Sequence, residues 1–379
     1  MVKVERSFAD DTQRELFALV EEIADKELAP RAAAEERSGR FPRELVELLG
    51  RAGLVGLPFP ERWGGGDQPY TLYLQVLERL AYRWFAVAES VHLQVLASHG
   101  LARFGGDEQR DRWLPRLLSG EVLGANALSE ADAGSDLEGI RTAAVREEGG
   151  YRISGTKSWV SHGGVAGLYN VYCRTGGAGL GGLTCLMVDA QTPGVLPQRP
   201  ERKMALATLP TAQVVLQDVR VPESMRLGRE NRGMLVAASV FDHGRLGIAA
   251  CAVGLAQAAL DYAADYAKGR VQFGSPIISF QGVGFLLADM ATQVAAARAL
   301  LLEAALIRDS GRPFATQAAQ AKLFATDTAM RVTTDAVQVL GGHGYVQDHP
   351  VERWMREAKL LQIIEGTNQI QRAAIARSL

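Results

Sequence analysis

Cysteine and histidine are scarce in this sequence, and basic residues form no runs. The three cysteines, Cys173, Cys185 and Cys251, have neither C-x-x-C nor Cys/His spacing, so we expect no disulfide framework and no zinc site. The six histidines are scattered, and we expect no other metal centre. A formal net charge of −2 gives no electrostatic case for binding nucleic acid or an anionic membrane surface.

Long hydrophobic runs and a secretion signal are also missing from the pattern. No run approaches the ~20 apolar residues of a transmembrane helix. The segment from Phe8 to Leu28 is rich in acidic residues and helical in period, unlike a signal peptide. We therefore expect a soluble, cytoplasmic protein. The hydrophobic fraction of 47% supports a large interior, and 379 residues predict two or three domains.

The apolar pattern changes twice along the chain. Residues 1–121 show apolar positions at helical spacing and predict an N-terminal helical domain. Residues 122–228 predict a β-barrel or sandwich domain, because short β-like runs alternate with turns such as the hairpin signal Glu148-Gly149-Gly150. The predicted strands are Thr142–Arg146, Tyr151–Trp159, Tyr169–Arg174, Leu183–Val188 and Val214–Val221.

The last part of the chain, residues 229–379, predicts an antiparallel four-helix bundle. Its Ala- and Leu-rich segments are joined by short Gly/Pro connections and cover Met234–Tyr266, Phe280–Arg308, Ala315–Val339 and Val351–Ile364. The fold class expected is thus mainly α with a β domain in the middle.

Glycines at 177–182 match G-x-G-x-x-G but do not indicate a nicotinamide site. A dinucleotide fingerprint follows a strand and opens a helix, whereas the segment after these glycines, 183–188, reads as another strand. We predict a flexible hairpin loop there.

The segment around Glu365 carries the clearest chemical signal. Glu365 follows an apolar run, precedes Gly366 and a short amphipathic helix, and has Thr367 and Gln369 just beyond it. Apolar neighbours desolvate a carboxylate and raise its pKa toward the range of a general base. The alternative is a helix N-cap glutamate on the surface.

Several segments together resemble the acyl-CoA dehydrogenase family. The resemblance lies in L-A-R-F-G-G-D-E-Q-R-D-R-W-L-P at 101–115, A-L-S-E-A-D-A-G-S-D at 127–136, G-T-K-S-W-V-S at 155–161, R-V-Q-F-G at 270–274, Q-V-L-G-G-H-G-Y at 338–345 and I-I-E-G-T-N-Q-I-Q-R at 363–372. Ser129 and Ala131 depart from the Thr and Pro usual in the family. A further departure lies in residues 203–211, where Ala207 and Leu209 replace Arg and Ser.

The resemblance implies FAD as the cofactor. It implies that Ser129 donates to the flavin pyrimidine edge, and that Trp159 packs against the ring with Ser161 on the same strand face, near N5. The flavin contacts it implies are Asn126, Leu128, Ser129, Gly134, Ser135, Trp159, Val160, Ser161, Arg270, Gln272, Phe273, Phe280, Gln281, Gln338, Val339, Gly341, Gly342, Thr367 and Gln369.

The resemblance also implies an oligomer. In the family, Arg270 and Gln338 would serve a flavin held mainly by a neighbouring subunit, so we expect a homotetramer or at least a dimer. Taken singly, each segment could be a helix end with a C-cap glycine.

Substrate contacts implied by the resemblance are Ser135, Asp242, Arg245 and Gly366. Asp242 and Arg245 would bind coenzyme A, although an i, i+3 pair of this kind is equally natural as a helix-surface ion pair. Glu89 and His92 correspond to a helix near the acyl pocket of relatives, where they would suit a polar acyl group, and a solvated helix face is the favoured interpretation for them.

The reaction implied is α,β-dehydrogenation of an acyl thioester. Glu365 takes the α-proton, the β-hydrogen leaves as hydride to flavin N5, and an electron-transfer flavoprotein or similar acceptor reoxidises the flavin. The Glu365 N–H and a flavin hydroxyl would form the oxyanion hole. Three alternatives stay open: the same chemistry on an acyl carrier protein, a flavin oxidase or monooxygenase, and a catalytically silent flavoprotein.

Overall fold

Helices fill the first third of the chain, as the sequence predicts. In the computed structural model, which describes residues 4–379, the Asp10 carboxylate caps the first long helix by accepting a hydrogen bond from the N–H of Gln13 at 2.8 Å. The helices here are α1 (Asp11–Ile23), a π-helical turn (Ala24–Leu28), α2 (Ala32–Ser38), α3 (Arg43–Arg51), α4 (Tyr70–Arg83), α5 (Phe85–Phe104) and α6 (Asp107–Leu118).

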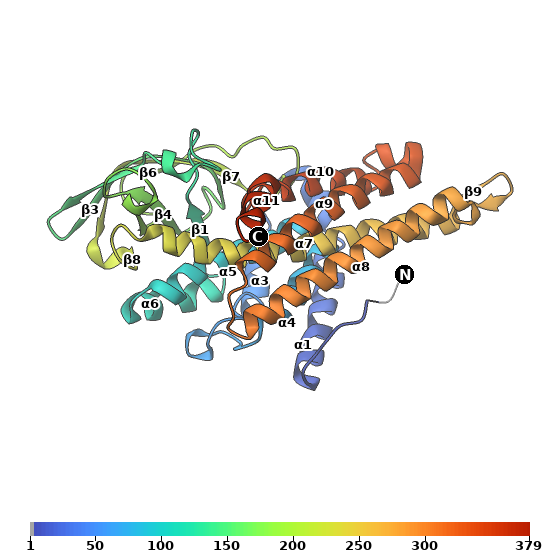
Figure 1. The fold of residues 1–379 in the computed structure, drawn as a ribbon, viewed down its shortest axis with the longest axis horizontal. Coiled ribbons are helices and arrows are strands. Elements are labelled where there is room, and N and C mark those ends of the chain that lie inside the picture. The colour runs from blue at the N-terminus through green and yellow to red at the C-terminus, as the bar shows by residue number, and fades with distance from the viewer. Residues whose placement is uncertain (1–3) are drawn as a thin grey trace.

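A mixed sheet follows and lies at one end of the molecule in Figure 1. Strand order is β6-β7-β3-β2-β4-β5-β8, and β1 pairs in parallel with β4. All five predicted strands are confirmed, and so is the hairpin at Gly149, where Glu147 pairs with Gly150. The strands are β1 (Gly124–Ala127), β2 (Ala143–Glu147), β3 (Gly150–Ser161), β4 (Leu168–Arg174), β5 (Leu183–Asp189), β6 (Val195–Pro197), β7 (Thr211–Pro222) and β8 (Arg226–Leu227).

Strand β3 is less regular than the sequence suggests. Its pairing with β7 shifts register between Lys157 and Val160, and Trp159 has a left-handed backbone with φ 52°. A bulge breaks the two-residue alternation of a strand. Beyond the bulge, Trp159 is exposed, Val160 is buried and Ser161 is half-buried, so a shared face for Trp159 and Ser161 stays a prediction.

Long helices form the last part of the chain, and α7 lies at their centre. It packs against α8, α9 and α10, and also against α4 and α5 of the N-terminal part. The elements are α7 (Gly233–Gly269), the hairpin strands β9 (Val271–Gln272) and β10 (Ser275–Pro276), α8 (Gln281–Asp309), α9 (Ala315–Leu340), α10 (Val351–Leu361) and α11 (Asn368–Ala376). The exact domain boundaries at 121/122 and 228/229 stay predictions.

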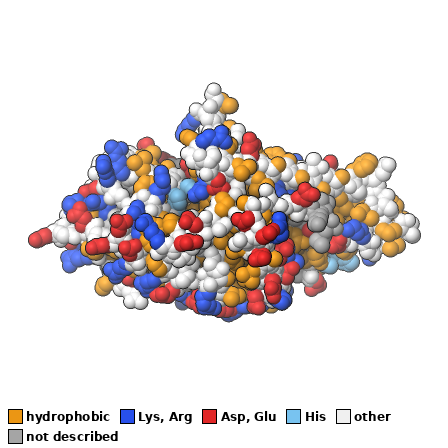
Figure 2. Space-filling view, turned by 90° about the horizontal axis from the view of Figure 1, so that it is seen from below, with side chains coloured by type: hydrophobic (Ala, Val, Ile, Leu, Met, Phe, Trp, Pro, Cys, Tyr) orange, Lys and Arg blue, Asp and Glu red, His pale blue; other side chains and the backbone are white. Residues whose placement is uncertain are grey.

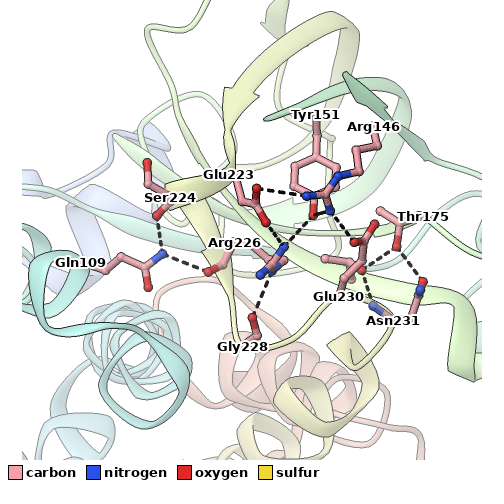
Figure 3. A network of polar contacts seen from close by, with 11 residues as sticks. Gln109, Arg146, Tyr151, Thr175, Glu223, Ser224, Arg226, Gly228, Glu230 and Asn231 are labelled. Atoms are coloured by element: carbon pink, nitrogen blue, oxygen red, sulfur yellow. Dashed lines mark hydrogen bonds and ion pairs between the residues drawn. The ribbon is translucent and has the colours of Figure 1, made fainter. Parts of the chain in front are cut away.

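Two large apolar cores hold the molecule together, and a third, small cluster contains Ala133, Ile140 and Leu183. The larger core joins the N-terminal and C-terminal helices, and a smaller one fills the interior of the sheet. A polar cluster fastens the sheet to α6: the Gln109 amide donates to the Arg226 carbonyl at 3.0 Å, and the Arg226 guanidinium donates to the Tyr151 hydroxyl at 2.9 Å (Figure 3). The sheet is thereby held against the helices.

Two helices, α7 and α8, are long and apolar enough to span a membrane by length and composition alone. The expectation that no segment would meet such a criterion is therefore wrong. The most apolar stretch of α7 is 94% buried inside the protein, which is typical of a core helix, but that of α8 is 28% buried. Phe285 and Leu306 of α8 are exposed. Acidic and basic side chains are interspersed over the face shown in Figure 2.

Candidate active site

Glu365 lies on the turn between α10 and α11, beside Gly244 in the first half of α7. The predicted fourth bundle helix ends at Leu361, so Ile363 and Ile364 belong to this turn. Glu365 has φ 52°, a conformation that non-glycine residues adopt at a cost, and Gly366 follows with φ 85°. A Cβ at Gly244 of α7 would lie only 2.3 Å from Glu365 Oε2, so the glycine makes room for the carboxylate.

The surroundings of the Glu365 carboxylate shift its pKa. Burial raises its pKa to about 7, while the positive charges of Arg245 and Lys322 act in the opposite direction. Its Oε2 atom is buried and has no hydrogen-bond partner among residues 4–379. A partnerless carboxylate with a pKa near neutrality is typical of a catalytic base and unusual for a structural side chain.

Two side chains that the sequence did not single out hold this turn. Lys322 of α9 donates from Nζ to the Gly366 carbonyl at 2.9 Å and to Asn368 Oδ1 at 2.8 Å. Gln371 of α11 donates from Nε2 to the carbonyls of Glu365 at 3.1 Å and Gly366 at 2.9 Å. A sequence signal for Lys322 did exist, because it is a single cation on the alanine-rich, apolar face of the predicted helix.

Asp242 and Arg245 form an ion pair at 2.7 Å on α7. Both side chains are largely buried, and burial raises the pKa of Asp242 while Arg245 lowers it. The pair is therefore not a solvent-exposed ion pair on the helix surface. Arg245 also lies close enough to Glu365 to influence its ionisation.

Glu89 and His92 are not on a solvated helix face, so that interpretation is wrong. Glu89 is 3% exposed, and burial together with the Glu365 charge raises its pKa to about 8. His92 is fully buried, with one ring nitrogen 3.2 Å from the Tyr73 hydroxyl and the other 3.1 Å from the Gly244 carbonyl. Helix α5 therefore brings polar groups to the Glu365 side of α7.

The loop after β1 is tied to β3 by a buried ion pair. Lys157 Nζ lies 2.8 Å from Glu130 Oε1 and donates to the Leu128 carbonyl at 2.8 Å. The Ser158 N–H donates to the Ser129 carbonyl at 2.9 Å. These contacts join the two predicted flavin motifs, and neither charged residue had been given a role from the sequence.

The surface formed by this loop and the β3 bulge fits a flat aromatic cofactor. The Trp159 side chain is 57% exposed although it is large and apolar, and the backbone at Gly134 has open space around it. An exposed indole favours packing against a ring system such as flavin. Ser129 and Ser161 are half-buried, Ser135 is exposed, Asn126 lies on β1, and Val160 has its side chain in the sheet core, so only its backbone is open to a ligand.

The remaining predicted flavin residues lie elsewhere, at the far end of the helices where the β9–β10 hairpin projects (Figure 1). Arg270 ends α7, 26 residues beyond Gly244, which corresponds to about 39 Å of helix. Tyr266, in the last turn of α7, bonds His343 at 2.6 Å and so places the 341–345 segment at the same end. Exposed residues at this end are Arg270, Gln272, Phe273, Phe280, Gln281, Gln338, Gly341 and Gly342, whereas Val339 is buried.

The other two predicted flavin residues, Thr367 and Gln369, follow Glu365 closely in the sequence. The Thr367 hydroxyl caps α11 by accepting a hydrogen bond from the Ile370 N–H at 3.3 Å, and Gln369 is exposed. One chain therefore brings Arg245 close to Glu365 and joins β3 to the 127–136 loop, but it leaves the Arg270 group distant from Gly244. Among residues 4–379, no group of three or more side chains is arranged to hold a metal ion.

Comparison with known proteins identifies the family. Models of the acyl-CoA dehydrogenase N-terminal, middle and C-terminal domains match residues 10–121, 125–219 and 231–379. The chain belongs to the acyl-CoA dehydrogenase family. It is therefore a flavin-dependent oxidoreductase, which confirms the predicted fold, enzyme class and cofactor, FAD.

Three relatives illustrate the similarity. An acyl-CoA dehydrogenase of Bacillus subtilis (strain 168) is 41% identical over 364 residues, covering 95% of this chain and 96% of the relative. The structure of butyryl-CoA dehydrogenase from Megasphaera elsdenii has a TM-score of 0.96 and 38% identity, covering 99% of both chains. The structure of PigA with FAD and proline has a TM-score of 0.95 and 26% identity, again over 99% of both chains.

Proposed function

We propose that this protein dehydrogenates an acyl-CoA to the trans-2-enoyl-CoA, with Glu365 as the base that removes the α-proton. The observation that carries the proposal is the buried Glu365 Oε2, which has no hydrogen-bond partner among residues 4–379 and belongs to a carboxyl group with a pKa of about 7. At neutral pH such a group is ionised often enough to accept a proton and basic enough to hold it.

The backbone N–H of Glu365 would activate the α-proton by donating a hydrogen bond to the thioester carbonyl. The Glu365 N–H makes no hydrogen bond to any other group in the described part of the chain, so it is available to a thioester carbonyl. A single oxyanion-hole donor contributes about 3–4 kcal/mol to the transition state. FAD, when bound, supplies the acceptor for the β-hydride, and Trp159 with the 127–136 loop orients it.

The thioester carrier we propose is coenzyme A, bound with the help of Arg245, Asp242 and Ser135. The names of the Bacillus subtilis and Megasphaera elsdenii relatives support CoA over an acyl carrier protein. Reoxidation by an electron-transfer flavoprotein and a cytoplasmic location complete the proposal.

Incubating the purified yellow protein with butyryl-CoA, with and without a dye acceptor, tests this function. We expect the flavin absorbance to bleach and the dye to be reduced, with enoyl-CoA as the product. Oxygen consumption in place of dye reduction would identify an oxidase. Bleaching only with a carrier-protein thioester would replace CoA, and no bleaching with any thioester would indicate a silent flavoprotein.

Substituting Gly244 by alanine (Gly244→Ala) tests the placement of the base. The new Cβ would lie 2.3 Å from Glu365 Oε2, so the carboxylate must move away from its position. A misplacement of about 1 Å can lower a rate by about 100-fold. We expect a fall of that order in the rate of flavin bleaching measured by stopped flow.

Gly181→Ala is the matched control, because Gly181 lies in the glycine loop before β5 and a Cβ there meets nothing within 4 Å. It should leave the rate unchanged. Equal rates for Gly244→Ala and wild type would mean that the carboxylate does not act from the position seen here.

A further inference from the structure

Lys322 is a buried cation directly behind the candidate base. Its side chain is fully buried, and the neighbouring inward positions of α9, Ala318, Ala321 and Ala325, are buried as well. Burying a charged ammonium in such surroundings costs free energy unless other charges and hydrogen bonds compensate for the lost hydration. Within the described chain, Lys322 forms no ion pair, and its Nζ donates to the Gly366 carbonyl at 2.9 Å and to the Asn368 amide oxygen at 2.8 Å.

We propose that Lys322 is a positioning residue that holds the Glu365–Gly366 turn and, through its charge, sets the pH range in which Glu365 is ionised. The inference rests on the proposed function of Glu365 as base. The ammonium reaches the residue next to Glu365 through a hydrogen bond, so it constrains the left-handed backbone that presents the carboxylate to α7.

The charged and titratable groups around Glu365 come from five elements. Tyr70 of α4, Glu89 of α5, Arg245 of α7, Lys322 of α9 and Tyr172 of β4 all interact with it electrostatically. Only Arg245 and Lys322 are cations among these groups.

The two cations differ in how far their charge is offset. Arg245 is paired with Asp242 at 2.7 Å, which offsets much of its field. Lys322 has neutral hydrogen-bond partners, and the charges that act on it are those of Glu365, Asp327 of its own helix and Arg245. Burial lowers the pKa of Lys322 to about 7, while Glu365 and Asp327 raise it. Arg245 lowers the pKa of Glu365 more than Lys322 does, and Lys322 is the one of the two without an ion-pair partner in the described chain.

Removing the charge of Lys322 should change the pKa of Glu365 in a definite direction. A nearby cation favours the ionised form of a carboxyl group, so its loss raises the pKa of Glu365. The acid limb of the pH–rate profile for flavin bleaching then moves to higher pH, and the rate recovers on the alkaline side. A purely structural role would instead lower the rate by the same factor at every pH.

The experiment compares Lys322→Gln and Lys322→Arg by stopped-flow bleaching with butyryl-CoA across the pH range. Lys322→Gln keeps a hydrogen-bond donor without the charge, and its acid limb should move upward by about one pH unit or more. Lys322→Arg keeps a charge at every pH of the experiment, so its acid limb should not move upward. Where the amide disturbs folding, Lys322→Met removes the charge with a side chain of similar length that matches the alanine surroundings.

Gln371→Met is the matched control, since Gln371 bonds the same Gly366 carbonyl at 2.9 Å but carries no charge. It should lower the rate without moving the limb. An unmoved limb in both charge-free Lys322 variants overturns the inference. That result is distinct from failure of the proposed function, which would appear as undiminished bleaching when Glu365 itself is replaced.

Discussion

Glu365→Gln should yield a folded, yellow protein whose flavin is bleached by butyryl-CoA about 10³-fold more slowly than in wild type. Glutamine keeps the size and polarity of the side chain but cannot accept the α-proton. Either side chain occupies the same space beside Gly244, so binding of the thioester should survive. Single-turnover stopped flow separates the two effects, because the bleaching rate falls while its dependence on substrate concentration stays similar.

Glu108→Gln provides the control for the chemical change itself. Glu108 is an exposed residue on α6, far from the turn in sequence and outside every contact described for the site. It should bleach at the wild-type rate. Bleaching of the Glu365→Gln protein within tenfold of wild type would show that another group takes the proton.

Arg270→Ala should release FAD and weaken subunit association together. We propose that the Arg270 end of one subunit completes the flavin site of another, because one chain holds Arg270 about 39 Å of helix away from Gly244. The same end exposes Phe273 at 97% and Tyr345 at 86%, which is unusual for large apolar side chains without a partner. The FAD-loaded protein should therefore be a homotetramer, or at least a dimer.

The magnitude follows from the charged hydrogen bonds that are lost. A guanidinium facing the FAD pyrophosphate makes bonds of about 1.5–3 kcal/mol each, so flavin affinity should fall by roughly 10- to 150-fold for one such bond. Because ligand and partner binding stabilise each other, the oligomer should dissociate at higher protein concentrations than wild type. Light scattering combined with flavin absorbance measures both.

Arg312→Ala serves as the control for removing an arginine. Arg312 is exposed in the loop between α8 and α9, at the other end of α8 from the hairpin. This variant should keep its flavin and its mass. A wild-type monomer that retains a full complement of FAD would rule out the shared site.

Local sequence patterns predicted most of the fold because they act over a few residues. The hairpin at Gly149, the strand Leu183–Val188 after the glycine loop and the long helix from Met234 follow from turn residues and from apolar spacing. The errors arose where distant segments decide. Glu89, expected on a solvated helix face, is buried because α5 packs against α7.

By itself, the sequence determined the family, the fold and the position of one candidate base, since the segments that carry these signals are continuous in the chain. The tertiary structure alone decided what surrounds that base. Gly244, Lys322 and Gln371 reach the Glu365 turn from three different helices. Burial and charge act through space, so the pKa of Glu365 depends on side chains that lie far from it in the sequence and next to it only after folding.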